Sequence, residues 1–102
     1  MSDPGSDYFR TIVFFCRDIL YEVDDIVELS GENRYMSELL DSLFEMDSYA
    51  VPHVLALEGA LGRYQSKLTS LYARYPDVPF VDTLLRRITS LREMCANCVD
   101  SF

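Results

Sequence analysis

The sequence predicts an all-α fold, either a small antiparallel four-helix bundle or two stacked helical hairpins. First, three stretches carry apolar residues at alternating spacings of three and four, which places one apolar stripe along each helix. Second, 102 residues suit one domain with a core of its own. Third, short links join the stretches, so neighbouring helices should run antiparallel. The stripes are Phe9, Ile12, Cys16, Ile19, Val23 and Ile26; Val54, Leu57, Leu61, Tyr64, Leu68, Leu71 and Tyr75; and Val81, Leu84, Ile88, Leu91, Cys95, Cys98 and Phe102.

The chain should begin with a flexible tail over residues 1–6, and a single helical-bundle domain should follow over residues 7–102. The first helix is expected over about residues 7–29, with Ser6 or Asp7 as its N-cap. Ser30 and Gly31 should end it, since glycine accepts the left-handed conformation that follows many helices.

The second helix is expected over about residues 34–46, with Asn33 as its N-cap. The third should open at Pro52, a residue favoured at the first helical position, and continue to residue 75. Gly59 and Gly62 lie three apart on one face of it, which predicts either the close approach of another helix or a slight bend. The inner face of the second helix is predicted to hold Tyr35, Met36, Leu39, Leu40, Leu43 and Phe44.

The fourth helix is expected over residues 79–99, after a tight connection at residues 76–79 that contains two prolines. A faint repeat accompanies this arrangement, because Val51-Pro52 and Val78-Pro79 each open a helix after a short loop. One alternative is therefore a fragment of a helical repeat scaffold.

Charge is distributed unevenly along the chain. Residues 1–51 contain twelve acidic and three basic residues, whereas residues 52–102 contain five acidic and six basic residues. The acidic half disfavours nucleic acid and anionic membrane, and no apolar run approaches the roughly 20 residues of a membrane span. A protein partner with a basic or mixed apolar and basic surface, or a second copy of the chain, fits this charge better.

The soft metal ligands are Cys16, His53, Cys95 and Cys98, the last two in a Cys-x-x-Cys half-site. All three cysteines lie on the apolar stripes, where free cysteine packs as a small hydrophobe. We therefore expect no metal and no other cofactor. An odd and low cysteine count, together with an N-terminus that lacks the basic start of a signal peptide, predicts an intracellular protein.

Paired carboxylates offer a second alternative. Glu22 and Asp25, and likewise Glu38 and Asp41, lie three apart on a helix. This arrangement resembles that of all-helical nucleotide pyrophosphatases, which bind magnesium with such pairs, and the resemblance implies a metal-dependent nucleotide hydrolase. On the first helix, however, these acids lie away from the apolar stripe, and no catalytic motif accompanies them. The preferred prediction is a protein without enzymatic activity.

The residues that break the helical pattern indicate a binding surface. Phe14 lies about 170° from the apolar stripe on a helical wheel, and Tyr21 lies one heptad later on the same side. Aromatic side chains rimmed by charge are typical of protein-binding patches. The sequence therefore predicts a non-enzymatic interaction module, an adaptor or assembly subunit that binds a partner or itself by helix-face packing. Its predicted contact residues are Phe14, Asp18, Tyr21, Asp25, Glu28 and Leu55.

Overall fold

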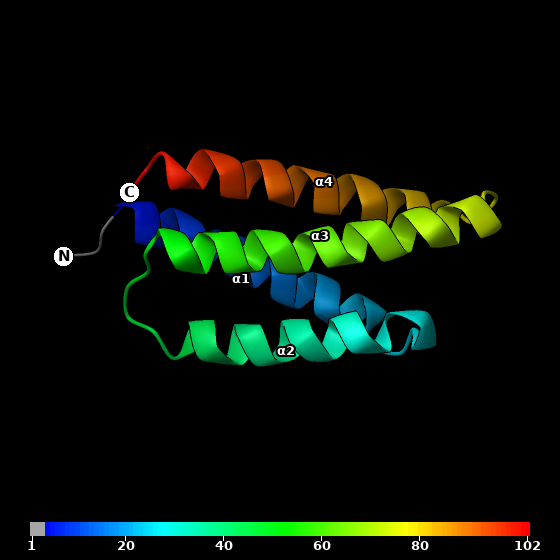
Figure 1. Ribbon diagram of the computed structural model, residues 1–102, viewed down its shortest axis with the longest axis horizontal. Coiled ribbons are helices and arrows are strands. Elements are labelled where there is room, and N and C mark those ends of the chain that lie inside the picture. Colours follow the sequence, from blue (N-terminus) through cyan, green and yellow to red (C-terminus); the bar gives the residue numbers. More distant parts are fainter. Residues whose placement is uncertain (1–3) are drawn as a thin grey trace.

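The computed structural model describes residues 4–102 and holds four α-helices that run antiparallel around one core (Figure 1). Helix α1 packs against α2, α2 against α3, α3 against α4, and α4 against α1. This closed arrangement confirms the predicted four-helix bundle, whereas the units of an open repeat array contact only their neighbours. The elements are α1 (Pro4–Val23), the short 3₁₀ helix η1 (Val27–Leu29), α2 (Ser30–Phe44), α3 (Val51–Arg74) and α4 (Pro79–Val99).

The three apolar stripes form most of the core, as predicted. Only their last members depart from it: Ile26 is partly buried, while Tyr75 and Phe102 are exposed. Val13 is fully buried although it lies off the stripe, because α1 contacts both α2 and α4. The buried stripe residues are Phe9, Ile12, Cys16, Ile19, Val23, Val54, Leu57, Leu61, Tyr64, Leu68, Leu71, Val81, Leu84, Ile88, Leu91, Cys95 and Cys98.

The start of α1 corrects the predicted tail, of which residues 1–3 lie outside the described part of the chain. Pro4, Gly5 and Ser6 already belong to α1, so Ser6 and Asp7 do not cap it. The Ser6 hydroxyl accepts a hydrogen bond of 3.0 Å from the Tyr49 backbone N–H. Gly5 lies against the C-terminus, where a Cβ atom would come within 2.9 Å of the Ser101 carbonyl oxygen.

The first helix ends at Val23, six residues before the predicted end. Its last carbonyl accepts hydrogen bonds from the Ile26 N–H at 3.0 Å and from the Asn33 amide at 2.8 Å. Asn33 is therefore a buried residue within α2 and not its N-cap, and its Oδ1 accepts a 2.5 Å hydrogen bond from the Tyr64 hydroxyl. Ser30 and Gly31 open α2 and do not end α1.

The predicted inner face of α2 is correct in its centre and too wide at its edges. Met36, Leu40 and Leu43 are buried. Leu39 and Phe44 are only partly buried against the core, and Tyr35 is exposed. Phe44 consequently belongs to the rim of the bundle, beside α1.

Helices α3 and α4 lie side by side along their whole length, and their joined end extends past the ends of α1 and α2 (Figure 1). Gly59 faces open space, and the atoms nearest a Cβ on Gly62 belong to the Arg92 guanidinium, at 3.5 Å. The close helix approach predicted at this pair of glycines is thus not what the structure shows. Helix α4 has the predicted bounds.

Candidate functional site

The strongest candidate site is a groove between α1 and α2. It is a hollow of about 350 Å³ with an aromatic wall, and we call it the α1–α2 groove. The rings of Phe14 and Phe44 meet edge to face, with their centroids 5.3 Å apart. The groove is lined by Phe14, Arg17, Leu20 and Tyr21 from α1 and by Ser37, Leu40, Asp41 and Phe44 from α2.

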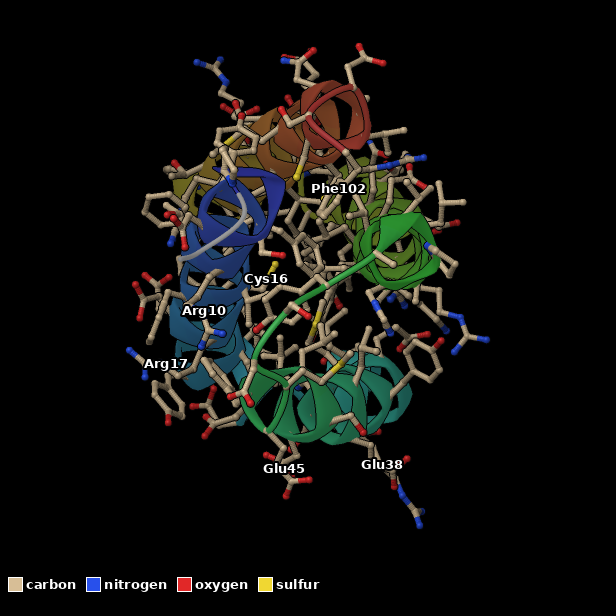
Figure 2. The ribbon with its side chains drawn as sticks, turned by 90° about the vertical axis from the view of Figure 1, so that its left-hand side faces the viewer. Arg10, Cys16, Arg17, Glu38, Glu45 and Phe102 are labelled. Atoms are coloured by element: carbon tan, nitrogen blue, oxygen red, sulfur yellow. The ribbon has the colours of Figure 1, made fainter. Side chains whose placement is uncertain are left out.

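Arg17 occupies the centre of this aromatic wall. Its guanidinium carbon lies 4.8 Å from the ring centroid of Phe14, 5.8 Å from that of Phe44 and 5.9 Å from that of Tyr21. These distances are those of cation–π contacts, in which the negative ring face attracts the cation. Figure 2, which looks along the bundle, shows Arg17 at the outer edge of α1 while Cys16 points between the helices.

The polar contacts of Arg17 are weak. Its ion pair with Asp18, the neighbouring residue, spans 3.9 Å between Nη2 and Oδ1. Its Nε atom is covered from solvent and has no hydrogen-bond partner among residues 4–102. A buried N–H without an acceptor is unfavourable, because it has given up its bond to water without replacement. The rings, and not hydrogen bonds, therefore hold this guanidinium.

Three of the six predicted contact residues gather here. Phe14 and Tyr21 line the groove with 41% and 66% of their surfaces exposed, and Asp18 pairs with Arg17 at its edge. Asp25 and Glu28 are exposed beyond the end of α1, Asp25 in the turn and Glu28 in η1. The structure thus places these two acids outside the groove lining.

Leu55 lies apart from the other predicted contact residues. It is 56% exposed on α3, where it lines a smaller hollow with Arg92 and Val99 of α4. Leu55 is therefore outside the α1–α2 groove, and its role as a contact residue stays a prediction.

The helical pattern predicts Phe44 on the inner face of the second helix, and it does not include Arg17 among the contact residues. The signal for Phe44 was its place at the edge of the α2 stripe. No pattern within one helix predicts that the Arg17 guanidinium stacks on the Phe44 ring, because the two residues come from different helices.

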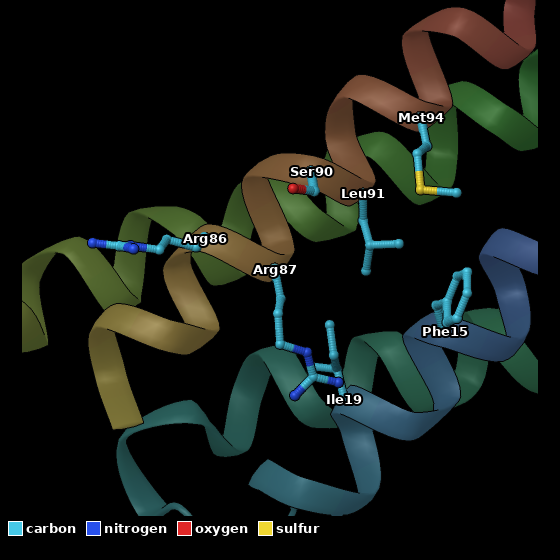
Figure 3. Close-up of a pocket in the computed structure, with 7 residues that line it drawn as sticks. All are labelled: Phe15, Ile19, Arg86, Arg87, Ser90, Leu91 and Met94. Carbon is cyan, nitrogen blue, oxygen red and sulfur yellow. The ribbon is translucent and has the colours of Figure 1, made fainter. Parts of the chain in front are cut away.

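A second groove lies between α1 and α4 (Figure 3). Its hollow of about 300 Å³ has an apolar floor, and Phe15 beside it is 47% exposed. Its charges are paired within the chain, Arg87 with Glu22 at 2.5 Å and Arg86 with Asp82 at 3.3 Å. The lining residues are Phe15, Ile19, Arg86, Arg87, Ser90, Leu91 and Met94.

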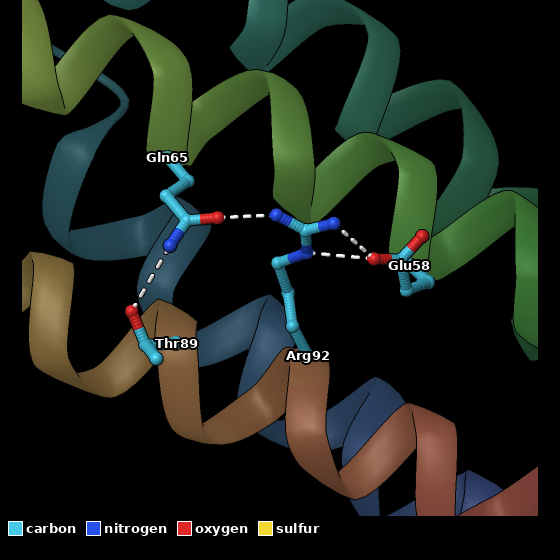
Figure 4. A network of polar contacts seen from close by, with 4 residues as sticks. All are labelled: Glu58, Gln65, Thr89 and Arg92. Atoms are coloured by element: carbon cyan, nitrogen blue, oxygen red, sulfur yellow. Dashed lines mark hydrogen bonds and ion pairs between the residues drawn. The ribbon is translucent and has the colours of Figure 1, made fainter.

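The polar face of α3 and α4 differs from both grooves (Figure 4). Arg92 donates from Nε to Glu58 at 2.7 Å and also bonds through its two terminal nitrogens to Glu58 and Gln65. The Gln65 amide donates to the Thr89 hydroxyl at 3.2 Å. Every nitrogen of the Arg92 guanidinium is thus engaged, which is the opposite of the situation at Arg17.

The carboxylates of the hydrolase alternative are not assembled into a metal site. Within residues 4–102, no group of three or more His, Cys, Asp or Glu side chains lies close enough to hold one ion. Glu22 instead pairs with Arg87, and Glu38 pairs with Arg34 at 3.6 Å on the outer side of α2.

The cysteines are core residues. Cys16, Cys95 and Cys98 are buried, and the Cys98 thiol donates to the Gly5 carbonyl oxygen at 3.7 Å. Burial raises the pKa of the Cys95 thiol to about 12 and that of the Cys16 thiol further, because the thiolate would lose its hydration. The thiolate needed for nucleophilic attack or for metal ligation is therefore disfavoured at neutral pH. His53 accepts a 2.9 Å hydrogen bond from the Ala50 N–H through Nδ1, which satisfies a donor at the start of α3.

None of the helices in residues 4–102 combines the length and the apolar character needed to cross a membrane. No protein-family description, curated protein or solved structure matches this chain. The candidate site consequently rests on its own geometry: three rings from two helices, one weakly bonded arginine, and a surrounding of carboxylates.

Proposed function

We propose that this chain is a non-enzymatic protein-binding module that works as an adaptor or assembly subunit, with the α1–α2 groove as its contact surface. One observation carries the proposal. Phe14 and Tyr21 are exposed in a groove whose other wall contains Phe44, although helix packing could have buried them. Aromatic side chains in a hollow supply most of the energy of many protein contacts, because they remove a large apolar area from water.

The negative charge around the groove indicates the kind of partner that it would bind. Asp18 and Asp41 lie at the groove itself, while Asp24, Asp25 and Glu28 follow at the end of α1. Carboxylates at the rim of an interface steer basic partners and repel acidic ones. The proposed partner is therefore a protein segment with apolar and basic side chains. A second copy of the chain is the other candidate, since residues 52–102 are not acidic overall.

The compartment proposed is a reducing, intracellular one. The chain has only three cysteines and all three are buried in the core, whereas disulfide-stabilised proteins of oxidising compartments commonly carry a larger, even number of cysteines. The buried thiols support this assignment, although they take no part in the proposed contact.

The test uses two neighbouring residues that expose similar areas. Phe14→Glu places a charge in the α1–α2 groove, while Phe15→Glu places the same charge on the α1–α4 side. Tagged wild-type protein and both variants are used for affinity capture, and the retained proteins are quantified by mass spectrometry. We expect a partner that the wild type and Phe15→Glu retain equally and that Phe14→Glu loses.

Two further measurements complete the test. Circular dichroism checks that both variants keep the helical fold, and light scattering reports the mass of each in solution. A mass that falls from dimer to monomer only in Phe14→Glu would identify the partner as a second copy. Identical partners and identical masses for folded wild type and Phe14→Glu would contradict the proposal.

A further inference from the structure

We infer that the rings of Phe14, Tyr21 and Phe44 form a binding site for a lysine or arginine side chain of the partner, and that Arg17 occupies this site in the free protein. The inference rests on the proposed function and names the chemical group that the groove recognises. Its occupant is the basic side chain of a protein segment lying along α1 and α2.

The ring site already holds a cation, the guanidinium of Arg17. Three ring centroids lie within 6 Å of one guanidinium carbon. Each ring contact at an exposed site favours the bound cation by about two- to fivefold in its equilibrium constant. The other stacked arginines differ, because Arg10, Arg63 and Arg74 each lie over a single ring among the described residues.

Arg17 is poorly held in this site by polar contacts. Its buried Nε has no acceptor, and the nearest carboxylate is 3.9 Å away. When Arg17 turns outward, Nε regains a hydrogen bond to water, which offsets part of the loss of ring contact. A cation that leaves no donor unsatisfied can therefore replace it.

The charge and shape of the surrounding surface also fit a basic partner. Asp41 lines the groove beside the rings, and Asp18 stands at its edge. A second hollow of about 310 Å³ adjoins the groove, with Leu20, Tyr21 and Ser37 in common, and continues along α1 to Asp24. The only basic residue in that continuation, Arg34, already pairs with Glu38. The surface thus suits an elongated basic segment with one cation placed on the rings.

The experiment removes the occupant and adds small cations. Arg17→Ala vacates the rings, and Arg17→Gln keeps part of the side chain without its charge. Wild type and both variants are titrated with tetramethylammonium chloride and with guanidinium chloride, at constant ionic strength set with sodium chloride. Aromatic NMR resonances of Phe14, Tyr21 and Phe44 report binding, and those of Tyr72 and Tyr75, far along the α3–α4 hairpin, serve as internal references.

The expected result is that both variants bind both cations at least about fivefold more tightly than the wild type, as expected when a competing cation is removed. The matched control is Arg63→Ala, which uncovers the single ring of Tyr35. It should produce no gain of this size. Addition of Phe44→Ala to Arg17→Ala should abolish the gain, because it removes one wall.

The inference is overturned if folded Arg17→Ala and Arg17→Gln both bind the cations no better than the wild type, or if Arg63→Ala gains as much. This outcome is separate from failure of the proposed function. Loss of partner capture in Phe14→Glu together with absent cation binding would leave the module intact and refute only the ring site. Capture unaffected by Phe14→Glu would refute the proposed function whatever the titrations give.

Discussion

Arg17 and Arg92 expose the same 39% of their side chains, yet their guanidinium groups make opposite kinds of contact. Arg92 lies across α3 and α4 and is bonded by Glu58 and Gln65 at all three nitrogens. Arg17 lies across α1 and α2 on three rings, with a covered Nε and a long ion pair of 3.9 Å to Asp18. Two arginines of equal exposure are therefore held by very different contacts. The C-terminal pair of helices uses its arginine to join two helices, and the N-terminal pair leaves its arginine exchangeable.

The largest expected effect on stability comes from the buried hydrogen bonds that join Asn33 to the Tyr64 hydroxyl and to the Val23 carbonyl. Asn33→Ala removes the acceptor of the Tyr64 hydroxyl and the donor to the Val23 carbonyl. We expect a loss of about 2–3 kcal/mol in the free energy of unfolding, because buried polar groups then lack partners. Urea denaturation followed by circular dichroism measures it.

Tyr64→Phe is the control for Asn33→Ala. It removes only the hydroxyl and should cost about 1–2 kcal/mol. The double variant should cost less than the sum of the two single variants, since the pair shares one hydrogen bond. Additive losses would mean that the two side chains act independently, and the role assigned to the network would then be wrong.

The next effect concerns Arg92 itself. Arg92→Met keeps most of the apolar stem of the side chain and removes the guanidinium, which lies over Gly62 and bonds to Glu58 and Gln65. We expect a loss of about 1–1.5 kcal/mol, less than a buried charged hydrogen bond would give, because solvent screens a half-exposed pair. Thermal unfolding at low and high salt tests this, and the difference from wild type should shrink as salt rises.

A smaller effect on stability is expected from a change on α3 that touches neither arginine. Gly59 is a helix-interior residue, and a Cβ atom added there meets nothing within 4 Å. Gly59→Ala should stabilise the protein by about 0.5–1 kcal/mol, because alanine loses less backbone entropy on folding. A higher midpoint of urea denaturation, with an unchanged dependence of the unfolding free energy on urea concentration, would show this stabilisation. Destabilisation would mean that α3 needs the bend that glycine permits.

The periodicity of the sequence accounts for the core and for the fold class. Cys16, Cys95 and Cys98 lie on the apolar stripes, and their burial follows from that position alone. The periodicity did not predict the two ends of the first helix correctly. Helix α1 begins at Pro4, with the C-terminus packed on Gly5 in its first turn, and it ends at Val23, where Asn33 of α2 binds its last carbonyl. Both boundaries depend on contacts between segments far apart in the chain.

The candidate site was predictable only in part, for the same reason. Phe14 and Tyr21 stand out on a helical wheel because they oppose the stripe of their own helix. Phe44 does not, since it lies at the edge of its stripe, and only the packing of α1 on α2 brings its ring over Arg17. Leu55 also leaves its stripe, but its helix places it beside α4. Patterns within one helix identify exposed residues and do not identify which of them meet.

The smallest expected effect is the one that decides the comparison. Arg17→Met removes the cation from the rings but also removes the unsatisfied Nε, and the thioether makes favourable contacts with aromatic rings. We expect the free energy of unfolding to change by less than about 0.5 kcal/mol, measured by urea denaturation beside Arg92→Met. A loss above about 1 kcal/mol would make Arg17 a structural link between α1 and α2. The two arginines would then be equivalent, and the rings would not be free to accept a partner's side chain.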